Sequence, residues 1–151
     1  MTPHTNFSIK KYSPVEIAPV VYDIVKHSFT RYFDHIPETL DKVIEYIKDS
    51  DVYMVYDGII PVGYFVLRQK LPKEYELLSM AVSGEHQGKG IGTFMMEKVN
   101  LICQGATISL VTHPKNVTAL IIYLKNGFVI DGWLNNYLGD GQPRLSLTKK
   151  S

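Results

Sequence analysis

The sequence predicts a mixed α/β protein with one main sheet, formed by a single domain over residues 1–151. Short apolar or alternating stretches, typical of strands, interleave along the chain with stretches whose apolar residues recur at helical spacing. The length of 151 residues suits one domain with a sizeable core, and neither a linker nor an internal repeat divides it. We therefore expect one compact unit.

The N-terminal half is expected to form two helices and four strands. In chain order these are a strand over 7–12, a helix that starts near Pro19, a helix over about 38–48, a β-hairpin of 52–56 and 60–68 around a turn at Asp57-Gly58, and a central strand over about 74–82. The start of the first helix has two interpretations. Ser13-Pro14-Val15-Glu16 matches a capping box, but a helix from there would contain Pro19. A turn, then a helix with Pro19 at its first position, is the simpler interpretation.

The C-terminal half is expected to alternate helices and strands. The expected elements are a helix that ends at Cys103 and is capped by Gly105, a buried strand over 106–112, a helix that begins at Asn116, a strand over about 128–135 and a final strand over 143–149.

The central strand leads into a glycine-rich turn, Gln87-Gly88-Lys89-Gly90-Ile91-Gly92, which opens the next helix. Three glycines at alternate positions let the backbone curl tightly and let a ligand come close. The amides of such a curl, together with the free N–H groups of a helix start, form a concave anion site. The expected occupant is a phosphate or a pyrophosphate.

Two common phosphate-binding motifs do not fit this turn. A Walker A loop has four residues between its first Gly and Gly-Lys, whereas three residues separate Gly84 from Gly88-Lys89. The dinucleotide fingerprint Gly-x-Gly-x-x-Gly also fails, because the run here is Gly-x-Gly-x-Gly.

The turn instead resembles the Gln/Arg-x-x-Gly-x-Gly/Ala signature of the GNAT superfamily, the acetyl-CoA-dependent N-acetyltransferases. Gln87, Gly90 and Gly92 stand at the signature positions. A second stretch, from Asn116 to Phe128, resembles the other signature of this superfamily, with Asn, Ala, Tyr and Gly-Phe in order and at the expected spacing. The resemblance covers nearly the whole chain and implies a central mixed sheet flanked by helices on both faces.

The resemblance implies acetyl-CoA as cosubstrate and indicates which residues contact it. Backbone atoms of the central strand would supply the oxyanion donor and pair with the pantetheine arm, and the turn would hold the pyrophosphate. Asn116 suits a helix N-cap as well as a contact to the cofactor, and Lys89 either neutralises phosphate charge or is solvated. The residues implied are Met80, Ala81, Val82, Gln87, Gly88, Lys89, Gly90, Ile91, Gly92, Thr93, Asn116 and Ala119.

Glu76 on the central strand is the candidate general base. A lysine-like amine has a pKa of about 10.4 and is mostly protonated at pH 7, so presenting the free base costs roughly 4–5 kcal/mol. A carboxylate that accepts the proton, directly or through water, lowers this cost. Several GNAT members carry a base at this position. Glu74, which shares a strand face with Glu76, and His113 are alternative bases, and a solvated surface position is the alternative for Glu76 itself.

Tyr123 matches the tyrosine that protonates the departing CoA thiolate in the GNAT family. Its alternative is simple core packing on a helix that also carries Leu120, Ile121 and Leu124. The aromatic stretch from Phe29 to Phe33 lies where such folds place a wall of the acceptor site, so Phe29, Tyr32 and Phe33 are candidate substrate-binding residues.

Composition describes an ordinary globular protein, 45% hydrophobic and 21% charged, with a net charge of +1. A net charge this close to zero gives no electrostatic sign of binding to nucleic acid or to an anionic membrane. The single cysteine, Cys103, excludes an internal disulfide, and no stretch reads as a signal peptide or a membrane span, so we expect a cytoplasmic protein. No His/Cys/carboxylate cluster has metal-site spacing, so no metal is expected.

The leading hypothesis is an N-acetyltransferase that moves the acetyl group of acetyl-CoA to a primary amine, most simply that of a small molecule. The alternatives are a protein or peptide N-acetyltransferase and a non-catalytic acyl-CoA-binding regulatory module. Many relatives in the superfamily form homodimers, so a homodimer is a further possibility. The residues carry no signature of the acceptor amine.

Overall fold

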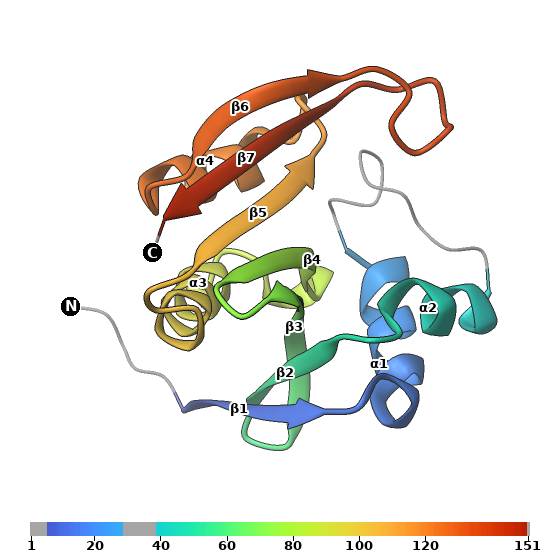
Figure 1. Ribbon diagram of the computed structural model, residues 1–151. Coiled ribbons are helices and arrows are strands. Elements are labelled where there is room, and N and C mark those ends of the chain that lie inside the picture. Colours follow the sequence, from blue (N-terminus) through green and yellow to red (C-terminus); the bar gives the residue numbers. More distant parts are fainter. Residues whose placement is uncertain (1–5, 29–38, 151) are drawn as a thin grey trace.

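The computed structural model describes residues 6–28 and 39–150 (Figure 1). Their strands form one seven-stranded sheet in the order β1-β2-β3-β4-β5-β7-β6. The strands are β1 Phe7–Tyr12, β2 Asp51–Asp57, β3 Ile60–Leu71, β4 Glu74–Val82, β5 Thr107–Thr112, β6 Val129–Leu134 and β7 Arg144–Lys150. The β4–β5 pair is parallel and the other neighbouring pairs are antiparallel, so the predicted mixed α/β class is confirmed.

The helices cover both faces of this sheet, as the resemblance implies. They are α1 Pro14–Lys26, α2 Leu40–Ile47, α3 Ile91–Ile102 and α4 Val117–Lys125, with a short 3₁₀ turn at Gly84–His86. Alternate residues of β2 and β3 point to opposite faces. Val52, Met54, Tyr64 and Val66 pack with α1 and α2, while Val55, Phe65 and Leu67 pack with α3 and Tyr123 of α4. The core therefore consists of two clusters separated by the sheet.

The predicted start of the first helix near Pro19 is wrong. The helix begins at Pro14, and Pro19 lies inside it. Pro14 occupies the first turn, where the missing N–H costs nothing, and the Ser13 hydroxyl donates to the Glu16 carboxylate at 3.0 Å. Burial of Ile17 and its neighbours Ala18, Val21 and Ile24 outweighs the one hydrogen bond that Pro19 cannot make.

Other boundaries agree with the sequence or shift by a few residues. The central strand spans the predicted residues, and the hairpin turn is Gly58-Ile59, with Gly58 at a φ of +63°. Cys103, not Gly105, is the C-cap of α3, and Gly105 follows with a φ of +81°. Thr39 caps α2 by accepting a hydrogen bond from the Lys42 N–H, and the predicted start of this helix at residue 38 lies outside the described residues.

Two irregularities of β4 shape the centre of the sheet. Against β3, Val66 pairs with Ser79 and Leu67 with Leu77, so Leu78 is an extra, bulged residue. Against β5, pairing covers only Glu74–Glu76 opposite Thr107–Ser109. Beyond Glu76 the two parallel strands separate, and the edge of Leu77–Val82 that faces β5 has no strand partner in the described part of the chain. This separation opens the sheet at the carboxyl ends of β4 and β5.

Candidate active site

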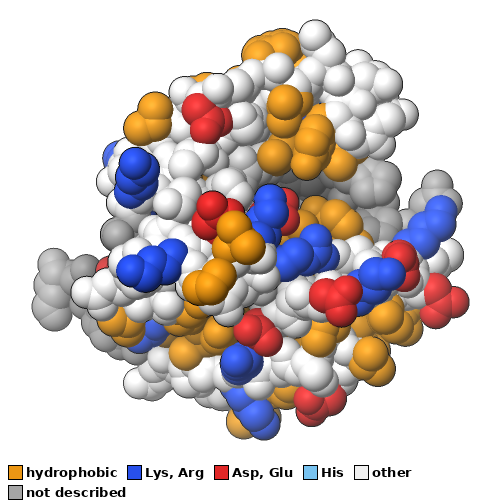
Figure 2. All heavy atoms as spheres, viewed as in Figure 1, with side chains coloured by type: hydrophobic (Ala, Val, Ile, Leu, Met, Phe, Trp, Pro, Cys, Tyr) orange, Lys and Arg blue, Asp and Glu red, His pale blue; other side chains and the backbone are white. Residues whose placement is uncertain are grey.

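A cavity of about 690 Å³ lies where β4 and β5 separate. Its walls come from the second half of β4, the glycine-rich turn, the end of β5, one side of α4, parts of α1 and α2, and the loop between β6 and β7. The space-filling view shows the molecule hollowed between its two halves, with acidic and basic side chains near the rim (Figure 2). The carboxyl ends of neighbouring parallel strands are where α/β proteins place their ligands.

The glycine-rich turn presents backbone donors to this cavity. Gly88 and Gly90 have φ angles of +80° and +82°, which favour glycine, and Gly90 is the N-cap of α3. The Phe94 N–H makes the first helical bond, to Gly90, which leaves the N–H groups of the three preceding residues without a helical partner. The first turn of α3 contains no acidic residue. The arrangement suits a bound anion.

Gln87 and Gly92 hold the turn in place. The Gln87 side-chain amide donates to the Val82 carbonyl at 3.3 Å, which ties the turn to the end of β4. A Cβ at Gly92 would lie 3.2 Å from the Ile122 side chain of α4, so glycine lets α3 and α4 approach closely here. Both residues line the cavity, and their roles suit the signature positions they occupy.

Most residues that the sequence assigned to the cofactor line this one cavity: Met80, Ala81, Val82, Gln87, Gly88, Gly90, Ile91, Gly92, Thr93, Asn116 and Ala119. Lys89 differs, because it is exposed and stands outside the lining. Asn116 is buried and caps α4, with its side-chain oxygen accepting from the Ala119 N–H at 3.4 Å. The predicted cap is confirmed, and it places the side chain at the cavity wall.

Glu76 and Tyr123 both line the cavity, one from strand β4 and the other from helix α4. Glu76 lies on β4, and its carboxylate is 4.0 Å from the Arg68 guanidinium of β3. Tyr123 lies on α4, is 7% exposed, and packs edge-to-face on Phe128. Glu76 is the one carboxylate among the described residues of the lining, and Glu74 is absent from it. A carboxylate that can accept a proton and a phenol that can donate one therefore line the same cavity.

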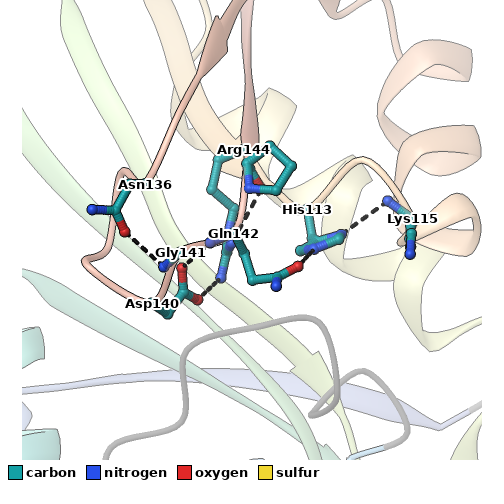
Figure 3. Close-up of polar contacts among 8 residues, drawn as sticks. His113, Lys115, Asn136, Asp140, Gly141, Gln142 and Arg144 are labelled. Carbon is teal, nitrogen blue, oxygen red and sulfur yellow. Dashed lines mark hydrogen bonds and ion pairs between the residues drawn. The ribbon is translucent and has the colours of Figure 1, made fainter.

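His113 has a structural environment. It is 3% exposed and does not line the cavity. Its Nδ1 accepts a hydrogen bond from the Lys115 N–H at 3.0 Å, and its Nε2 lies 3.1 Å from the Gln142 side-chain oxygen (Figure 3). Nε2 therefore carries the proton and donates to Gln142, since the backbone N–H occupies the Nδ1 lone pair. Both ring nitrogens are engaged, which argues against His113 as the base.

Arg144 is a cavity residue that sequence reasoning missed. It is 2% exposed, and its guanidinium donates to Asp140 at 2.8 Å and to the Pro143 carbonyl at 3.1 Å (Figure 3). The Gln142 N–H, and then Arg144, lower the pKa of Asp140. Alternation predicted the strand but not the burial of its first residue, because the partner comes from the preceding loop.

Three more cavity residues that sequence reasoning missed, Tyr46, Arg68 and Lys70, lie beside Glu76 at the β3 side of the cavity. Tyr46 of α2, Arg68 and Lys70 of β3 and Glu76 of β4 form this part of the lining, which we call the β3 arm. The predicted aromatic wall of Phe29, Tyr32 and Phe33 lies outside the described residues. No sequence pattern marks Arg68 or Lys70 as a cavity residue, since charges that alternate along a strand normally indicate a solvated face.

A family model described as an acetyltransferase (GNAT) domain matches residues 48–130, more than half of the chain. The chain belongs to the GNAT acetyltransferase family. As a GNAT protein it is an acetyl-CoA-dependent N-acetyltransferase. No curated protein matches its sequence.

Solved structures share the GNAT fold over nearly the whole chain. An IAA acetyltransferase from Bacillus cereus ATCC 14579 has a TM-score of 0.79 and 19% identity, covering 97% of this chain and 100% of that one. A GNAT acetyltransferase from Elizabethkingia anophelis with acetyl-CoA bound has a TM-score of 0.79 and 18% identity, covering 98% and 100%. The ribosomal-protein-S18-alanine N-acetyltransferase from Escherichia coli has a TM-score of 0.79 and 17% identity, covering 95% and 92%. At these identities the likeness establishes the fold.

Two further features of this GNAT protein concern the described residues alone. None of their helices has the length and apolar character that a membrane crossing requires. They also contain no group of three or more His, Cys, Asp or Glu side chains positioned to hold a metal ion.

Proposed function

We propose that this GNAT protein transfers the acetyl group of acetyl-CoA to the primary amine of a small molecule, with Glu76 as general base and Tyr123 as general acid. The observation that carries this proposal is the single cavity in which the phosphate-binding turn, the separated strands, Glu76 and Tyr123 meet. The cavity joins a cofactor end at α3 to the β3 arm, so two substrates can meet within it.

The cofactor end explains how acetyl-CoA would bind. The free N–H groups at the start of α3 would hold the pyrophosphate, and the exposed edge of β4 from Leu77 to Val82 would pair with the amides of the pantetheine arm. Ala119 on α4 offers a small side chain where the thioester end approaches. A β4 amide near the bulge at Leu78 would stabilise the negative charge that develops on the thioester oxygen.

The reaction would proceed by direct attack. The acceptor nitrogen forms a bond to the thioester carbon, and the bond from that carbon to the CoA sulfur breaks. Glu76 takes the proton lost by the amine, directly or through water, and the Tyr123 hydroxyl gives a proton to the departing thiolate. Tyr123 then regains a proton from water and Glu76 releases to water the proton that it took, which restores both groups. The products are an N-acetylated amine and free CoA, so each proton has a stated donor and acceptor.

Two observations favour a small acceptor. Both α2 and the β6–β7 loop contribute to the cavity walls, which suits a compact ligand more than an extended chain. Among similar structures, a spermidine N-acetyltransferase chimera has by its name a small amine as acceptor, at a TM-score of 0.75. A peptide acceptor is the alternative, because the Escherichia coli enzyme has by its name a ribosomal protein as substrate.

The test is release of free CoA thiol from acetyl-CoA across a panel of amines, amino acids, polyamines and short peptides. Tyr123→Phe should lower kcat about 100-fold, because it removes the proton donor, while the Kd for acetyl-CoA stays unchanged. Tyr75→Phe is the matched control, since Tyr75 lies outside the cavity lining.

Two results would contradict the proposal. Full turnover by Tyr123→Phe would remove Tyr123 from its proposed role. No release with any acceptor, while acetyl-CoA still raises the melting temperature, would favour a non-catalytic acyl-CoA-binding module.

A further inference from the structure

We infer that the acceptor carries a carboxylate close to its amine, as a small amino acid does, and that Arg68 and Lys70 bind this carboxylate. The inference rests on the proposed function and concerns the β3 arm of the same cavity. It follows from the charges that this arm presents and from the hydrogen bonds that orient them.

The β3 arm places two cations beside the proposed base. Arg68 stands directly opposite Glu76 in the β3–β4 register. Lys70 lies two residues further along β3, at a bulge of the β3–β4 pairing between Gln69 and Leu71, and also lines the cavity. Lys70 is exposed and makes no ion pair with the described residues. The arm therefore contains two positive charges and the single carboxylate of Glu76.

The Arg68 guanidinium is fixed but incompletely bonded. Its Nη2 donates to the carbonyls of Tyr46 and Lys48 at 3.2 and 3.0 Å, which anchors it to the end of α2. Its Nη1 is 4.0 Å from Glu76, beyond hydrogen-bond distance. Its Nε is shielded from solvent and has no partner among the described residues. Buried hydrogen-bond donors normally have partners. An anionic ligand in this arm would supply an acceptor for the unpartnered donors of Arg68.

The β3 arm also differs from the rest of the cavity lining in its excess of positive charge. Arg144, the remaining Lys or Arg of the described lining, is buried and already paired with Asp140 at 2.8 Å. A polyamine would bring a second ammonium group against Arg68 and Lys70, whereas a carboxylate would be attracted to them. An acceptor with both groups can therefore place its amine at Glu76 and its carboxylate at the two cations.

The register limits the distance between the two groups of the acceptor. Residues directly opposite on antiparallel strands have Cβ atoms about 5 Å apart, and Arg68 and Glu76 form such a pair. The amine and the carboxylate should therefore be separated by one to a few carbon atoms. α-Amino acids and short ω-amino acids fit this description.

The experiment compares matched acceptors in which only the carboxylate changes. Amino acids are tested beside their carboxamides, and ω-amino acids of increasing chain length beside theirs. Rates are expressed per free amine, because the amine of a carboxamide is more acidic. The wild-type protein should favour the carboxylate member of the best pair by at least about tenfold in kcat/KM. Lengthening the carbon chain between the amine and the carboxylate should reduce this preference.

The decisive variant is Lys70→Gln, because Arg68→Gln would also remove the hydrogen bonds to α2. Lys70→Gln should lower the carboxylate-to-carboxamide ratio of kcat/KM about five- to tenfold. Lys73→Gln is the matched control, since Lys73 is an exposed lysine outside the lining, and it should leave the ratio unchanged. Arg68→Lys retains the charge and should keep more of the preference than Arg68→Gln.

The outcomes separate this inference from the function on which it rests. Equal turnover of carboxylates and carboxamides, or a ratio unchanged in Lys70→Gln, would overturn the inference and leave the acetyltransferase proposal intact. A preference for polyamines would also overturn it. No CoA release with any acceptor would overturn the proposed function, and the inference with it.

Discussion

The Tyr46 hydroxyl of α2 donates a hydrogen bond to the Leu78 carbonyl of β4, with 3.1 Å between the oxygens. Leu78 is the bulged residue of that strand, so this bond ties the bulge to a helix. The Arg68 guanidinium of β3 donates hydrogen bonds to the Tyr46 and Lys48 carbonyls, at the C-terminal end of the same helix. Helix α2 is thus bonded to both strands that form the β3 arm.

Removing the Tyr46 hydroxyl should loosen the bulge. Tyr46→Phe should lower the free energy of unfolding by about 1 kcal/mol, the typical net value of one hydrogen bond. It should also raise the KM for the acceptor more than the Kd for acetyl-CoA, because the bond lies on the β3 side of the cavity. Urea unfolding and steady-state kinetics measure both effects. Tyr53→Phe is the control, since it keeps the stacking on Phe65, and equal behaviour of the two variants would contradict the prediction.

Gly90, the N-cap of α3 in a left-handed conformation, should contribute to acetyl-CoA binding as well as to stability. Gly90→Ala and Gly58→Ala both place a Cβ on a residue with positive φ, at +82° and +63°, and neither Cβ would meet a described atom within 4 Å. Each should cost roughly 1–2 kcal/mol of stability through backbone strain alone. Calorimetric titration should show weaker acetyl-CoA binding for Gly90→Ala only. Loss of binding in both variants would mean that strain, not the anion site, is responsible.

The burial of the Cys103 thiol predicts that the free energy of unfolding depends on pH in the alkaline range. Burial raises the pKa of this thiol to about 11, from an ordinary value of 9.0. Between these values the unfolded thiol has lost a proton that the folded thiol keeps, so the free energy of unfolding should fall as pH rises from 9 to 11. Below pH 9 the contribution is complete.

The comparison that isolates this effect is wild type against Cys103→Ala. Urea unfolding at several pH values should give a steeper alkaline decline for the wild type. Parallel curves would show that the thiol does not contribute. At pH 8 the folded protein should also react slowly with a thiol reagent and react quickly once unfolded.

The Asp140–Arg144 pair should link the β6–β7 loop to acceptor binding. Asp140→Asn leaves the buried Arg144 without its carboxylate, so the melting temperature should fall and the KM for the acceptor should rise. Because the pKa of Asp140 is lowered, its contribution is complete above the ordinary pKa of 3.8 and is lost as pH falls through the folded value. The variant should therefore lose less stability than the wild type as pH falls below about 4.

A matched variant distinguishes the effect of losing the Asp140–Arg144 ion pair from the effect of losing another hydrogen-bonded carboxylate. Asp131 also has a lowered pKa, through hydrogen bonds from Ser146 and Thr148, but it lies on β6 away from the cavity. Asp131→Asn should lower stability while leaving the KM for the acceptor unchanged. A rise of KM in both variants would point to the β6–β7 sheet edge instead of Arg144.

Local rules predicted those parts of the protein that depend on neighbours in sequence. The glycine turn, the Asn116 cap and the central strand follow from backbone conformation and alternation within a few residues. The start of α1 was missed because burial of Ile17 and Val21 outweighs the local penalty at Pro19. This is a tertiary effect that the periodicity of one segment does not contain.

The site was predictable where the signatures lie and not elsewhere. The resemblance to the GNAT signatures assigned Gln87, Gly90, Gly92 and Tyr123, all of which line the cavity. The bulge at Leu78 and the separation of β4 from β5 arise instead from pairing between distant strands. Arg68 and Arg144 were missed for the same reason. Each is placed in the cavity by a partner elsewhere in the chain, α2 for Arg68 and the β6–β7 loop for Arg144.

The three-residue contact between β4 and β5 has a consequence for how the chain folds and opens. Strands β1 to β4 form one half of the molecule, and β5 to β7 with α4 form the other (Figure 1). Among the described residues, the strands of the two halves are joined by the three-residue ladder of β4 and β5 alone. Side-chain packing in the cluster around Leu77, Met95, Leu110 and Tyr123 therefore contributes much of their cohesion. Amide hydrogens of β5 and β7 should then exchange in one cooperative event, at a lower free energy than those of β2 and β3.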